Sequence, residues 1–311
     1  MRETAPDMDA FVLGTAQLGN VGRPMDDRTA RHIIDTAWDL GIRRFDTAPH
    51  YGLVLAERRL GEALRDRPRD EYRVSTKVGR RLVRQDATGW DDEGFVVPAA
   101  FRREWDPTAA GVRRSLDESL ERMAMSRIDT LYLHDPDAYG MTGIDTALDG
   151  LDQLRDDGRV GRVGIGSTSL DALLAGASSG IVDELMVAGR YTLLEQPAAA
   201  DLLPACEAEG VDVVAASVFN SGLLATPAPD DAHRYDHGPA PTPLVARARR
   251  LAHTCGAFDV ELPAAALQYP LRHGAVRAIA VGAEDAGQLR QTVERFLAPL
   301  PDELWKRLES A

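Results

Sequence analysis

The chain has little cysteine, little lysine and no long apolar run, and each absence excludes a class of protein. Its two cysteines, Cys206 and Cys255, are too few for a disulfide framework and lack the spacing of metal ligands. No apolar stretch approaches the ~18 residues of a transmembrane helix, and the N-terminus has no apolar segment typical of a signal peptide. We therefore expect a soluble cytoplasmic protein with no membrane partner, in which both cysteines are small buried hydrophobic residues.

Basic residues are outnumbered by acidic ones. The 311 residues include 36 Lys plus Arg against 49 Asp plus Glu, a formal net charge of −13. This balance argues against a basic face that binds nucleic acid or an anionic membrane, which leaves a small molecule as the expected partner. Only Lys77 and Lys306 are lysines, so a lysine is worth inspecting where arginine fills nearly every other basic position. The sequence does not indicate an oligomeric state.

Short apolar runs alternate with amphipathic helical patterns along the whole chain. Strands are predicted over residues 11–13, 43–45, 72–76, 130–133, 162–165, 184–187, 211–215 and 276–280. Helices are predicted between a cap at Asp26 or Asp27 and Gly41, and over 55–64, 108–123, 143–156, 170–177, 197–209, 243–254, 263–272, 285–296 and 301–308. Eight strand–helix units predict an α/β fold, a (β/α)₈ or TIM barrel that takes up residues 1–311 as a single domain, with extra C-terminal helices outside it.

Two linkers, residues 79–106 and 220–242, are long and without periodic pattern, as substrate loops or disordered segments are. A competing interpretation is a doubly wound dinucleotide-binding fold. Gly164 and Gly166 follow a strand, and Glu184 comes twenty residues after the first of them, but Ser169 replaces the third glycine of that fingerprint. The count of eight units favours the barrel over this alternative.

Four ionisable residues follow three consecutive predicted strands. Asp46 and Tyr51 come after the second strand, Lys77 after the third and His134 after the fourth. Reactive residues of such barrels lie just past the C-terminal ends of strands, so these side chains are expected at one mouth. Each alone has an ordinary structural interpretation, whereas four at one rim predict a catalytic site.

The four residue types suit proton transfer at an oxygen. A tyrosine hydroxyl has a pKa near 10, and an ammonium beside it lowers that pKa because it favours the phenolate. Asp46 would keep Lys77 charged and in place, and His134 would orient the reacting oxygen. The unit predicts interconversion of an alcohol and a carbonyl, provided that a hydride carrier takes part.

The motifs around these residues resemble the aldo-keto reductase family. Phe45-Asp46-Thr47-Ala48 with Tyr51-Gly52, Ser75-Thr76-Lys77, Leu131-Tyr132-Leu133-His134 and Gly164-Ile165-Gly166-Ser167 match in type, order and spacing, over about residues 13–293. The resemblance implies an extended nicotinamide dinucleotide at the barrel mouth, with Asp46, Tyr51, Lys77 and His134 as the catalytic tetrad. The cofactor-binding residues that it implies are Gly14, Thr15, Ala16, Asp46, Ser167, Arg190, Tyr191, Ser217, Phe219, Ser221, Gly222, Gly282 and Gln288.

Residues 13–19, 46–52, 76–80 and 188–194 resemble a narrower branch, the aldose 1-dehydrogenases, which act on L-fucose, D-threo-aldoses or L-galactose. The same branch includes pyridoxal 4-dehydrogenase. It implies oxidation of a cyclic hemiacetal hydroxyl to a lactone, with Tyr51 as the base. Substrate contacts are expected from His50, Trp90, Trp105 and His134, with Phe95 as a further apolar face. The alternatives are an NADPH-dependent aldehyde or ketone reductase and, from another class, a regulatory subunit that holds the cofactor.

Two positions depart from the family pattern. Ala216 stands where many members have an aromatic residue that stacks on the nicotinamide, and Phe219 is the possible replacement. Glu284 and Asp285 stand near positions that are basic in NADP-preferring relatives, with Arg290 as the nearest cation in the sequence. Because carboxylates repel a 2′-phosphate and accept a hydrogen bond from a free ribose hydroxyl, we predict NAD in preference to NADP.

A metal site is the weakest of the candidates. His233 and His237 are four residues apart and would face one another on a helix. No third ligand is identifiable, whereas catalytic zinc normally has three protein ligands. We therefore predict no metal, and interpret the pair as part of a solvated loop and residues 247–250 as a solvated helix face.

Overall fold

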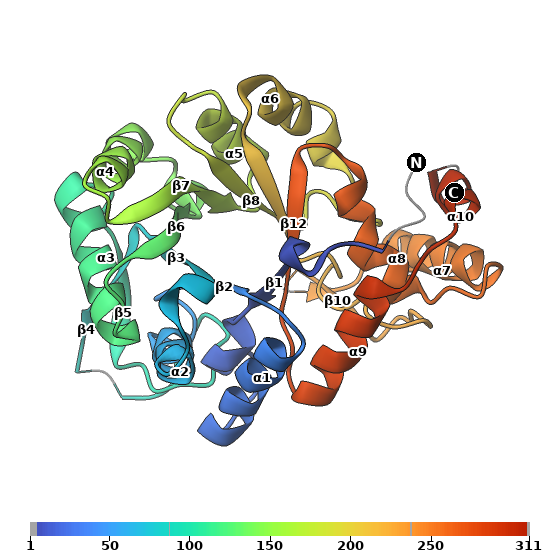
Figure 1. The fold of residues 1–311 in the computed structure, drawn as a ribbon, viewed down its shortest axis with the longest axis horizontal. Coiled ribbons are helices and arrows are strands. Elements are labelled where there is room, and N and C mark those ends of the chain that lie inside the picture. The colour runs from blue at the N-terminus through green and yellow to red at the C-terminus, as the bar shows by residue number, and fades with distance from the viewer. Residues whose placement is uncertain (1–4, 87, 237, 310–311) are drawn as a thin grey trace.

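Eight parallel strands close into a barrel, and helices surround it (Figure 1). The computed structural model describes residues 5–86, 88–236 and 238–309. In order around the barrel, the strands are β1 (Phe11–Gly14), β12 (Val276–Val281), β9 (Asp212–Ala216), β8 (Glu184–Ala188), β7 (Val160–Ser167), β6 (Ile128–His134), β3 (Arg73–Val78) and β2 (Arg44–Asp46). The closed order confirms the predicted (β/α)₈ barrel and overturns the doubly wound alternative, which has an open sheet.

The helices follow the predicted order, and four of them, α1, α3, α5 and α9, begin after a residue whose side chain caps them. Their bounds are α1 (Asp27–Asp39), α2 (Leu55–Leu64), α3 (Ala109–Met123), α4 (Ile144–Asp156), α5 (Leu170–Ala177), α6 (Leu202–Glu209), α7 (Thr242–Gly256), α8 (Leu262–Gln268), α9 (Ala286–Leu297) and α10 (Asp302–Glu309). Asp26 caps α1 by accepting a hydrogen bond from the Thr29 N–H at 2.7 Å. The predicted helix over 197–209 is interrupted, because a 3₁₀ turn (Pro197–Ala199) precedes α6.

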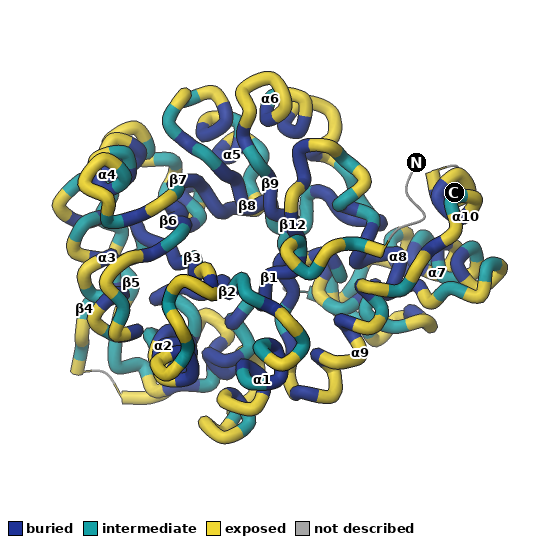
Figure 2. Tube along the Cα trace, in the orientation of Figure 1, coloured by how far each residue is buried: buried dark blue, intermediate teal, exposed yellow. Residues whose placement is uncertain are grey.

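The barrel has a filled interior and an outer layer of packed helices. Val12, Tyr132, Met186 and Val214 are buried inside it in one apolar cluster. The outward-facing residues of the same strands pack against the helices in a larger cluster. Figure 2 shows buried backbone along the strands and exposed backbone on the outer helix turns. This layered packing makes the barrel a rigid frame for the loops at its two ends.

The predicted linker over 79–106 is not structureless. It folds into an antiparallel hairpin of β4 (Arg80–Arg84) and β5 (Phe101–Trp105), paired from Arg80 with Trp105 to Arg84 with Phe101. Both strands are rich in arginine, which hides the apolar alternation by which strands are recognised. The hairpin lies beside the C-terminal end of β3, because only Gly79 separates β3 from β4.

A second apolar core lies beside the barrel. It joins α7, α8 and α10 to the loops that follow β8 and β9, through residues such as Leu194, Leu224, Leu251 and Trp305. Figure 1 shows α7 and α10 next to one another at the side of the barrel. The predicted linker over 220–242 contains a short ladder of β10 (Arg234–Tyr235) and β11 (Gly238–Pro239). The loops after β8 and β9 are therefore anchored from outside the barrel.

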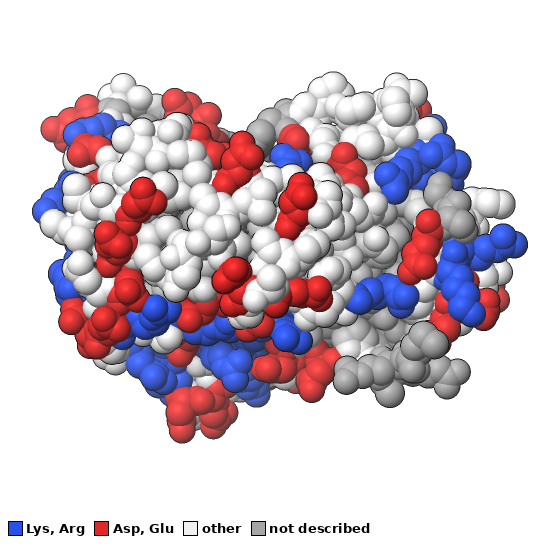
Figure 3. Space-filling view, turned by 90° about the horizontal axis from the view of Figure 1, so that it is seen from above, with Lys and Arg blue, Asp and Glu red and all other residues white. Residues whose placement is uncertain are grey.

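The surface carries both signs of charge. Acidic side chains are scattered over the face seen in Figure 3, and basic side chains gather along its lower part and at its right side. Within residues 5–86, 88–236 and 238–309, no helix has the length and apolar character needed to cross a membrane.

Candidate active site

A buried ion pair lies at the C-terminal mouth of the barrel. The Lys77 Nζ is 2.8 Å and 2.7 Å from the two carboxylate oxygens of Asp46 and donates a third hydrogen bond, at 2.9 Å, to the Thr47 carbonyl. Lys77 is 2% exposed and Asp46 is 3% exposed. Burial disfavours the ammonium, but Asp46 and Tyr51 together outweigh this effect and raise the pKa of Lys77. Lys77 is therefore charged and fixed in position at neutral pH.

Tyr51 is held over this ion pair by a close backbone contact. A Cβ on Gly52, whose φ is +64°, would lie 2.3 Å from the Gly19 carbonyl oxygen, and one on Gly19 would lie 2.6 Å from the Tyr51 carbonyl carbon. Only glycine fits at these two positions. The contact places the Tyr51 ring with its centroid 4.9 Å from the Lys77 Nζ.

The pKa of Tyr51 differs from the prediction. Burial raises it, and the opposing effect of the Lys77 charge is smaller, so that the pKa lies above its ordinary value and not below it. The Asp46 charge also raises it. The sequence argument had the sign of the lysine effect right but omitted the desolvation of the phenolate, which is the larger cause.

His134 lies at the end of β6 and faces Tyr51. The two rings meet edge to face with centroids 5.9 Å apart, and His134 is 7% exposed. Burial, together with the charges of Lys77 and Arg80, lowers the pKa of His134 well below its ordinary value. The imidazole is therefore neutral at pH 7 and is able to orient an oxygen without adding charge.

The expected substrate residues do not all lie at the same place. His50 is next to His134, with ring centroids 5.5 Å apart, and Phe95 meets His50 at 5.2 Å. Trp105 stacks on Tyr139 at 4.7 Å and donates to the Thr142 carbonyl at 2.9 Å. Trp90 is 68% exposed on the outer part of the loop. His50 and His134 are thus brought together with Tyr51, whereas Trp90 is not packed among them.

One expected cofactor residue, Thr15, and one residue that was not expected, Asn220, lie past the ends of β1 and β9. Thr15 follows β1 and is fully buried, and Asn220 follows β9 and is 4% exposed. The Thr15 Oγ1 and Asn220 Oδ1 have no hydrogen-bond partner among the described residues. Buried polar atoms normally have partners, so these two oxygens mark places where a polar ligand would complete the hydrogen bonding.

The loop over 217–222 adopts a backbone that suits a close ligand. Ser217, Asn220 and Ser221 have φ of 55°, 46° and 57°, and Gly222 has φ of 97° with open space where a Cβ would be. Consecutive left-handed residues are strained and are found at ligand sites. Phe219 lies between the two apolar cores.

Other expected cofactor residues have protein partners. The Ser167 hydroxyl donates to Asp137 at 2.5 Å, and the Arg190 Nε donates to the Thr168 carbonyl at 2.8 Å. Tyr191 is packed away from these groups, with its ring 5.6 Å from that of Tyr269 and 5.9 Å from that of His273. The Gln288 side chain accepts from the Glu284 N–H at 2.6 Å.

Glu284 and Asp285, the acidic residues of the expected cofactor site, lie near an arginine that was not predicted to be there. Arg23 pairs with Glu284 at 2.7 Å, and both side chains are about half exposed. Arg290, the cation nearest in the sequence, contacts the Thr36 hydroxyl at 3.4 Å. Glu284 is therefore balanced by a residue from the loop after β1.

The remaining expected cofactor residues, Gly14, Ala16 and Gly282, place only backbone or a methyl group near the mouth. Gly14 ends β1 and Ala16 begins a 3₁₀ turn (Ala16–Gly19), while a Cβ on Gly282 would overlap the Gln17 side chain.

His233 contacts Asp230 at 2.7 Å, and His237 lies outside the described residues. Where the structure describes the chain, no group of three or more His, Cys, Asp or Glu could hold a metal ion.

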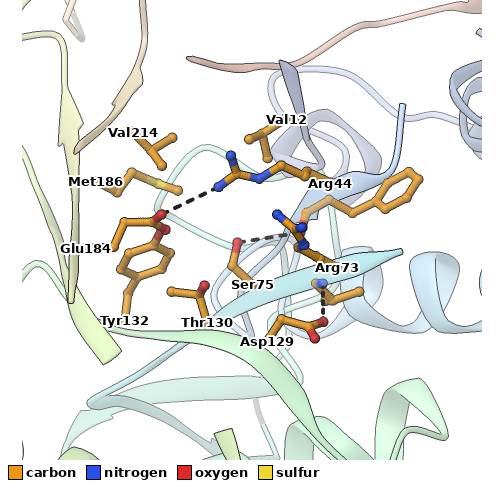
Figure 4. Close-up of a pocket in the computed structure, with 12 residues that line it drawn as sticks. Val12, Arg44, Arg73, Ser75, Asp129, Thr130, Tyr132, Glu184, Met186 and Val214 are labelled. Atoms are coloured by element: carbon orange, nitrogen blue, oxygen red, sulfur yellow. Dashed lines mark hydrogen bonds and ion pairs between the residues drawn. The ribbon is translucent and has the colours of Figure 1, made fainter. Parts of the chain in front are cut away.

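A charged pocket lies at the opposite, N-terminal end of the barrel. Figure 4 shows Arg44 pointing toward Glu184, with Tyr132 beside it. The Tyr132 hydroxyl donates a short hydrogen bond to Glu184, whose other oxygen is 3.5 Å from Arg44 and 3.2 Å from Arg162. Burial, followed by the charge of Glu184, raises the pKa of Tyr132 well above its ordinary value. This network connects side chains of four strands, β2, β6, β7 and β8.

Sequence reasoning missed the residues that the hairpin brings to the mouth. Arg103 of β5 contacts His50, and Arg80 of β4 pairs with Asp135 at 2.9 Å. The only sequence feature that pointed to these two arginines was the arginine-rich pattern of β4 and β5. Such a pattern is also typical of ordinary surface residues. Asn220 was also missed, although an Asn before Ser-Gly is typical of a left-handed backbone.

Comparison with known proteins agrees with this arrangement. The model of the Aldo/keto reductase family matches residues 10–311. A D-threo-aldose 1-dehydrogenase from Pseudomonas sp is 47% identical over 307 residues, covering 97% of this chain and 93% of that protein. A pyridoxal 4-dehydrogenase from Microbacterium luteolum is 35% identical over 326 aligned positions, covering 99% and 95%. A solved glycerol dehydrogenase from Gluconobacter oxydans superimposes with a TM-score of 0.79 at 23% identity, covering 100% and 95%, which shows the fold alone.

The barrel and these matches identify the chain as an oxidoreductase that uses a nicotinamide cofactor. The chain belongs to the aldo/keto reductase family.

Proposed function

We propose that this protein oxidises the anomeric hydroxyl of an aldose to a lactone, with NAD⁺ as the hydride acceptor. The observation that carries the proposal is the buried Lys77–Asp46 pair beneath Tyr51, with neutral His134 at its edge. The 47% identity to a protein named D-threo-aldose 1-dehydrogenase supports the substrate class, that of L-fucose and the D-threo-aldoses.

Each residue of this group has one task in the reaction. Tyr51 takes the proton from the anomeric hydroxyl as the C–H bond breaks and the carbonyl forms. Lys77 stabilises the phenolate that must exist for that transfer, and Asp46 keeps Lys77 charged. His134, neutral because its pKa is lowered, hydrogen-bonds the reacting oxygen. When bound, the nicotinamide accepts the hydride.

The residues around the mouth fit such a cofactor. The unpartnered oxygens of Thr15 and Asn220 offer polar contacts, and the open space at Gly222 leaves room beside the strained loop. We assign cofactor contacts to these residues and to Ser217, Phe219, Ser221 and Gly282. For Tyr191 the packing of its ring supports a role in shaping the loop instead of direct contact.

The charges around the mouth support a neutral substrate. Lys77, Arg80 and Arg103 face Asp46, Asp91, Glu93 and Asp135, and each cation has a carboxylate within 4 Å. No cation is left over among these residues for a phosphate or carboxylate group. A sugar without a phosphate, or an uncharged hemiacetal, fits this balance.

Pyridoxal oxidation is the second candidate. It is supported by the 35% identity to a pyridoxal 4-dehydrogenase and by the aromatic edge that Phe95 and His50 form beside Tyr51. Both candidates use the same proton transfer, so the two differ only in the ring that the pocket receives.

The preference for NAD over NADP rests on Glu284 and Asp285. Arg23 weakens the argument from charge, because it neutralises Glu284 at 2.7 Å. Asp285 caps α9 by accepting a hydrogen bond from the Gln288 N–H at 2.8 Å, so its carboxylate already interacts with the N-terminus of that helix. We still propose NAD, because a 2′-phosphate would have to displace the Arg23–Glu284 pair before it could use the cation.

The test is formation of NADH from NAD⁺ with L-fucose, L-galactose, D-arabinose, D-glucose and pyridoxal. Rapid formation with one sugar supports the proposal, and rapid formation with pyridoxal alone favours the second candidate. Reduction of simple aldehydes by NADPH in place of sugar oxidation would identify a general reductase. Tight cofactor binding with no turnover on the whole panel would favour a regulatory subunit.

A further inference from the structure

His50 occupies a central position that the proton-transfer scheme does not use. Its ring lies 6.2 Å from the ring of Tyr51 and 5.5 Å from that of His134, with Phe95 against it on another side. The side chain is 12% exposed. Any substrate whose oxygen lies between Tyr51 and His134 therefore has His50 as a neighbour.

One nitrogen of His50 is engaged by Arg103. The Arg103 Nε–H donates to the His50 Nδ1 at 2.7 Å. A guanidinium has only donors, so the nitrogen that it contacts must be an acceptor and carries no proton. The proton of the neutral ring is then on Nε2. Among the described residues, no protein group accepts a hydrogen bond from Nε2.

Arg103 is itself firmly held. Its guanidinium forms a two-pronged contact with Asp91, at 2.6 Å and 3.2 Å, and its side chain and that of Asp91 are 6% and 2% exposed. Glu93 lies 3.3 Å from the Arg103 Nε and 3.9 Å from the His50 Nδ1. Two-pronged pairs of this kind fix orientation as well as charge.

We propose that Arg103 is a positioning residue that fixes His50 as the Nε2–H tautomer, so that His50 presents a hydrogen-bond donor to a neutral oxygen of the substrate. The inference rests on the proposed function, because it takes the oxygen to be a hydroxyl or ring oxygen of the sugar. It identifies a device for substrate specificity that lies in the hairpin and not in the barrel.

Burial and the charges around His50 keep its ring neutral over a wide pH range, so that the contact with Arg103 can fix the tautomer. The cations that face it are Arg103 on β5, Arg80 on β4 and Lys77 on β3, and the carboxylates are Asp91 and Glu93 in the hairpin loop. Its ring neighbours, Tyr51 and His134, are neutral at pH 7. Burial first, and then Arg103, lower the pKa of His50 to about 3.

The first measurement is the nitrogen chemistry of His50 by NMR of ¹⁵N-histidine-labelled protein between pH 5 and 8. Comparison with a His50→Gln spectrum assigns the signal. We expect an unprotonated Nδ1 and a protonated Nε2 that do not change over this range. A protonated Nδ1, or titration near the ordinary histidine value, would overturn the proposal without any need for substrate.

The second measurement removes the positioning contact. Arg103→Met would leave the buried Asp91 unpaired, so the variant used is Arg103→Met with Asp91→Asn. The His50 signals should then move toward a mixture of tautomers. The control is Arg102→Met, because Arg102 is the neighbouring residue, is 54% exposed and pairs with Glu104 on the surface. An unchanged His50 in the double variant, or the same change in the control, would contradict the role of Arg103.

The third measurement asks whether the donor matters for the substrate. In His50→Asn, the Oδ1 can replace Nδ1 as the acceptor for Arg103, but no group remains at the position of Nε2. In His50→Gln, the amide nitrogen can replace Nε2. One neutral hydrogen bond corresponds to about a 3- to 10-fold change, so KM for the aldose should rise by that factor in Asn, with a smaller change in kcat.

The Gln variant should stay within about twofold of the wild-type KM, since it restores the donor. Equal KM values in His50→Asn and wild type, or equal increases of KM in His50→Asn and His50→Gln, would show that the Nε2–H does not donate a hydrogen bond to the substrate. Failure of every aldose to react would overturn the proposed function instead, and the NMR result would still decide the tautomer.

Discussion

The two ends of the barrel each hold a tyrosine beside a carboxylate and a cation, and Tyr132 is buried whereas Tyr51 is half-buried. At the mouth, Asp46 is occupied by Lys77 and by the Ser75 hydroxyl at 2.7 Å, and Tyr51 faces the ammonium. At the other end, the Tyr132 hydroxyl donates directly to Glu184, and the cations are arginines. Both tyrosines have a raised pKa, yet Tyr132 has its proton held by a carboxylate, whereas Tyr51 has a charge beside it that favours losing the proton. We propose that the nearest partner, more than burial, distinguishes the proposed catalytic Tyr51 from Tyr132.

The sharpest contrast is removal of each hydroxyl. Tyr51→Phe should lower kcat for sugar oxidation by about 10²- to 10⁴-fold, since it removes the proton acceptor. Tyr132→Phe should leave kcat within about twofold, because its hydroxyl contacts only Glu184, although it leaves a buried carboxylate short of a donor. Steady-state kinetics of both variants under identical conditions make the comparison. Similar losses in the two would remove the distinction between the ends.

The second contrast is in stability. Glu184→Gln should lower the free energy of unfolding by about 3 kcal/mol, the lower end of the range for a broken buried pair, because Arg162 is partly exposed. Activity at 25 °C should not change, as no group at the mouth is altered. Urea unfolding monitored by circular dichroism measures the loss. A tenfold drop in kcat with unchanged stability would mean that this end takes part in the reaction.

The third contrast is in pH dependence. Tyr51 must be deprotonated to act as a base, and its raised pKa means that this form is scarce at neutral pH. Below that pKa the deprotonated fraction grows up to tenfold per pH unit, so kcat/KM for oxidation should rise through pH 7–9 without a plateau. His134, whose pKa is lowered, should add no step between pH 5 and 8. A profile already flat from pH 7 would show that Lys77 outweighs burial after all.

The smallest effect concerns the rim of the mouth, where an exposed pair can be compared with the buried one. Glu284→Gln should free Arg23 and raise the ratio of kcat/KM for NADP⁺ to that for NAD⁺ by about 2- to 5-fold, less at high salt. Glu303→Gln is the matched control, because Glu303 forms a similar exposed pair with Lys306 on α10. No change in the ratio for Glu284→Gln would place the choice of cofactor elsewhere.

The mouth was more predictable from the sequence than its surroundings. Most of the eight strands contain a short apolar run, and Lys77 is conspicuous in a chain with only one other lysine, so the barrel and its buried pair could be anticipated. Arg103 and Arg80 could not, because their role depends on a hairpin that pairs across the long loop and brings an arginine to a histidine 53 positions away in the sequence. The raised pKa of Tyr51 also needed the structure, since desolvation depends on packing and not on neighbours in the chain.

The position of α10 has a consequence for how the protein is made. Its Leu304, Trp305 and Leu308 complete the second core, on which the loops after β8 and β9 rest. The barrel itself closes only when β12 pairs with β1. A ribosome delivers both of these segments after the other seven barrel strands, so a nascent chain holds most of those strands while the proposed cofactor loops still lack their support. We expect cofactor affinity to be acquired abruptly when α10 is added, and chains cut before α10 to lose that affinity before they lose their helical content.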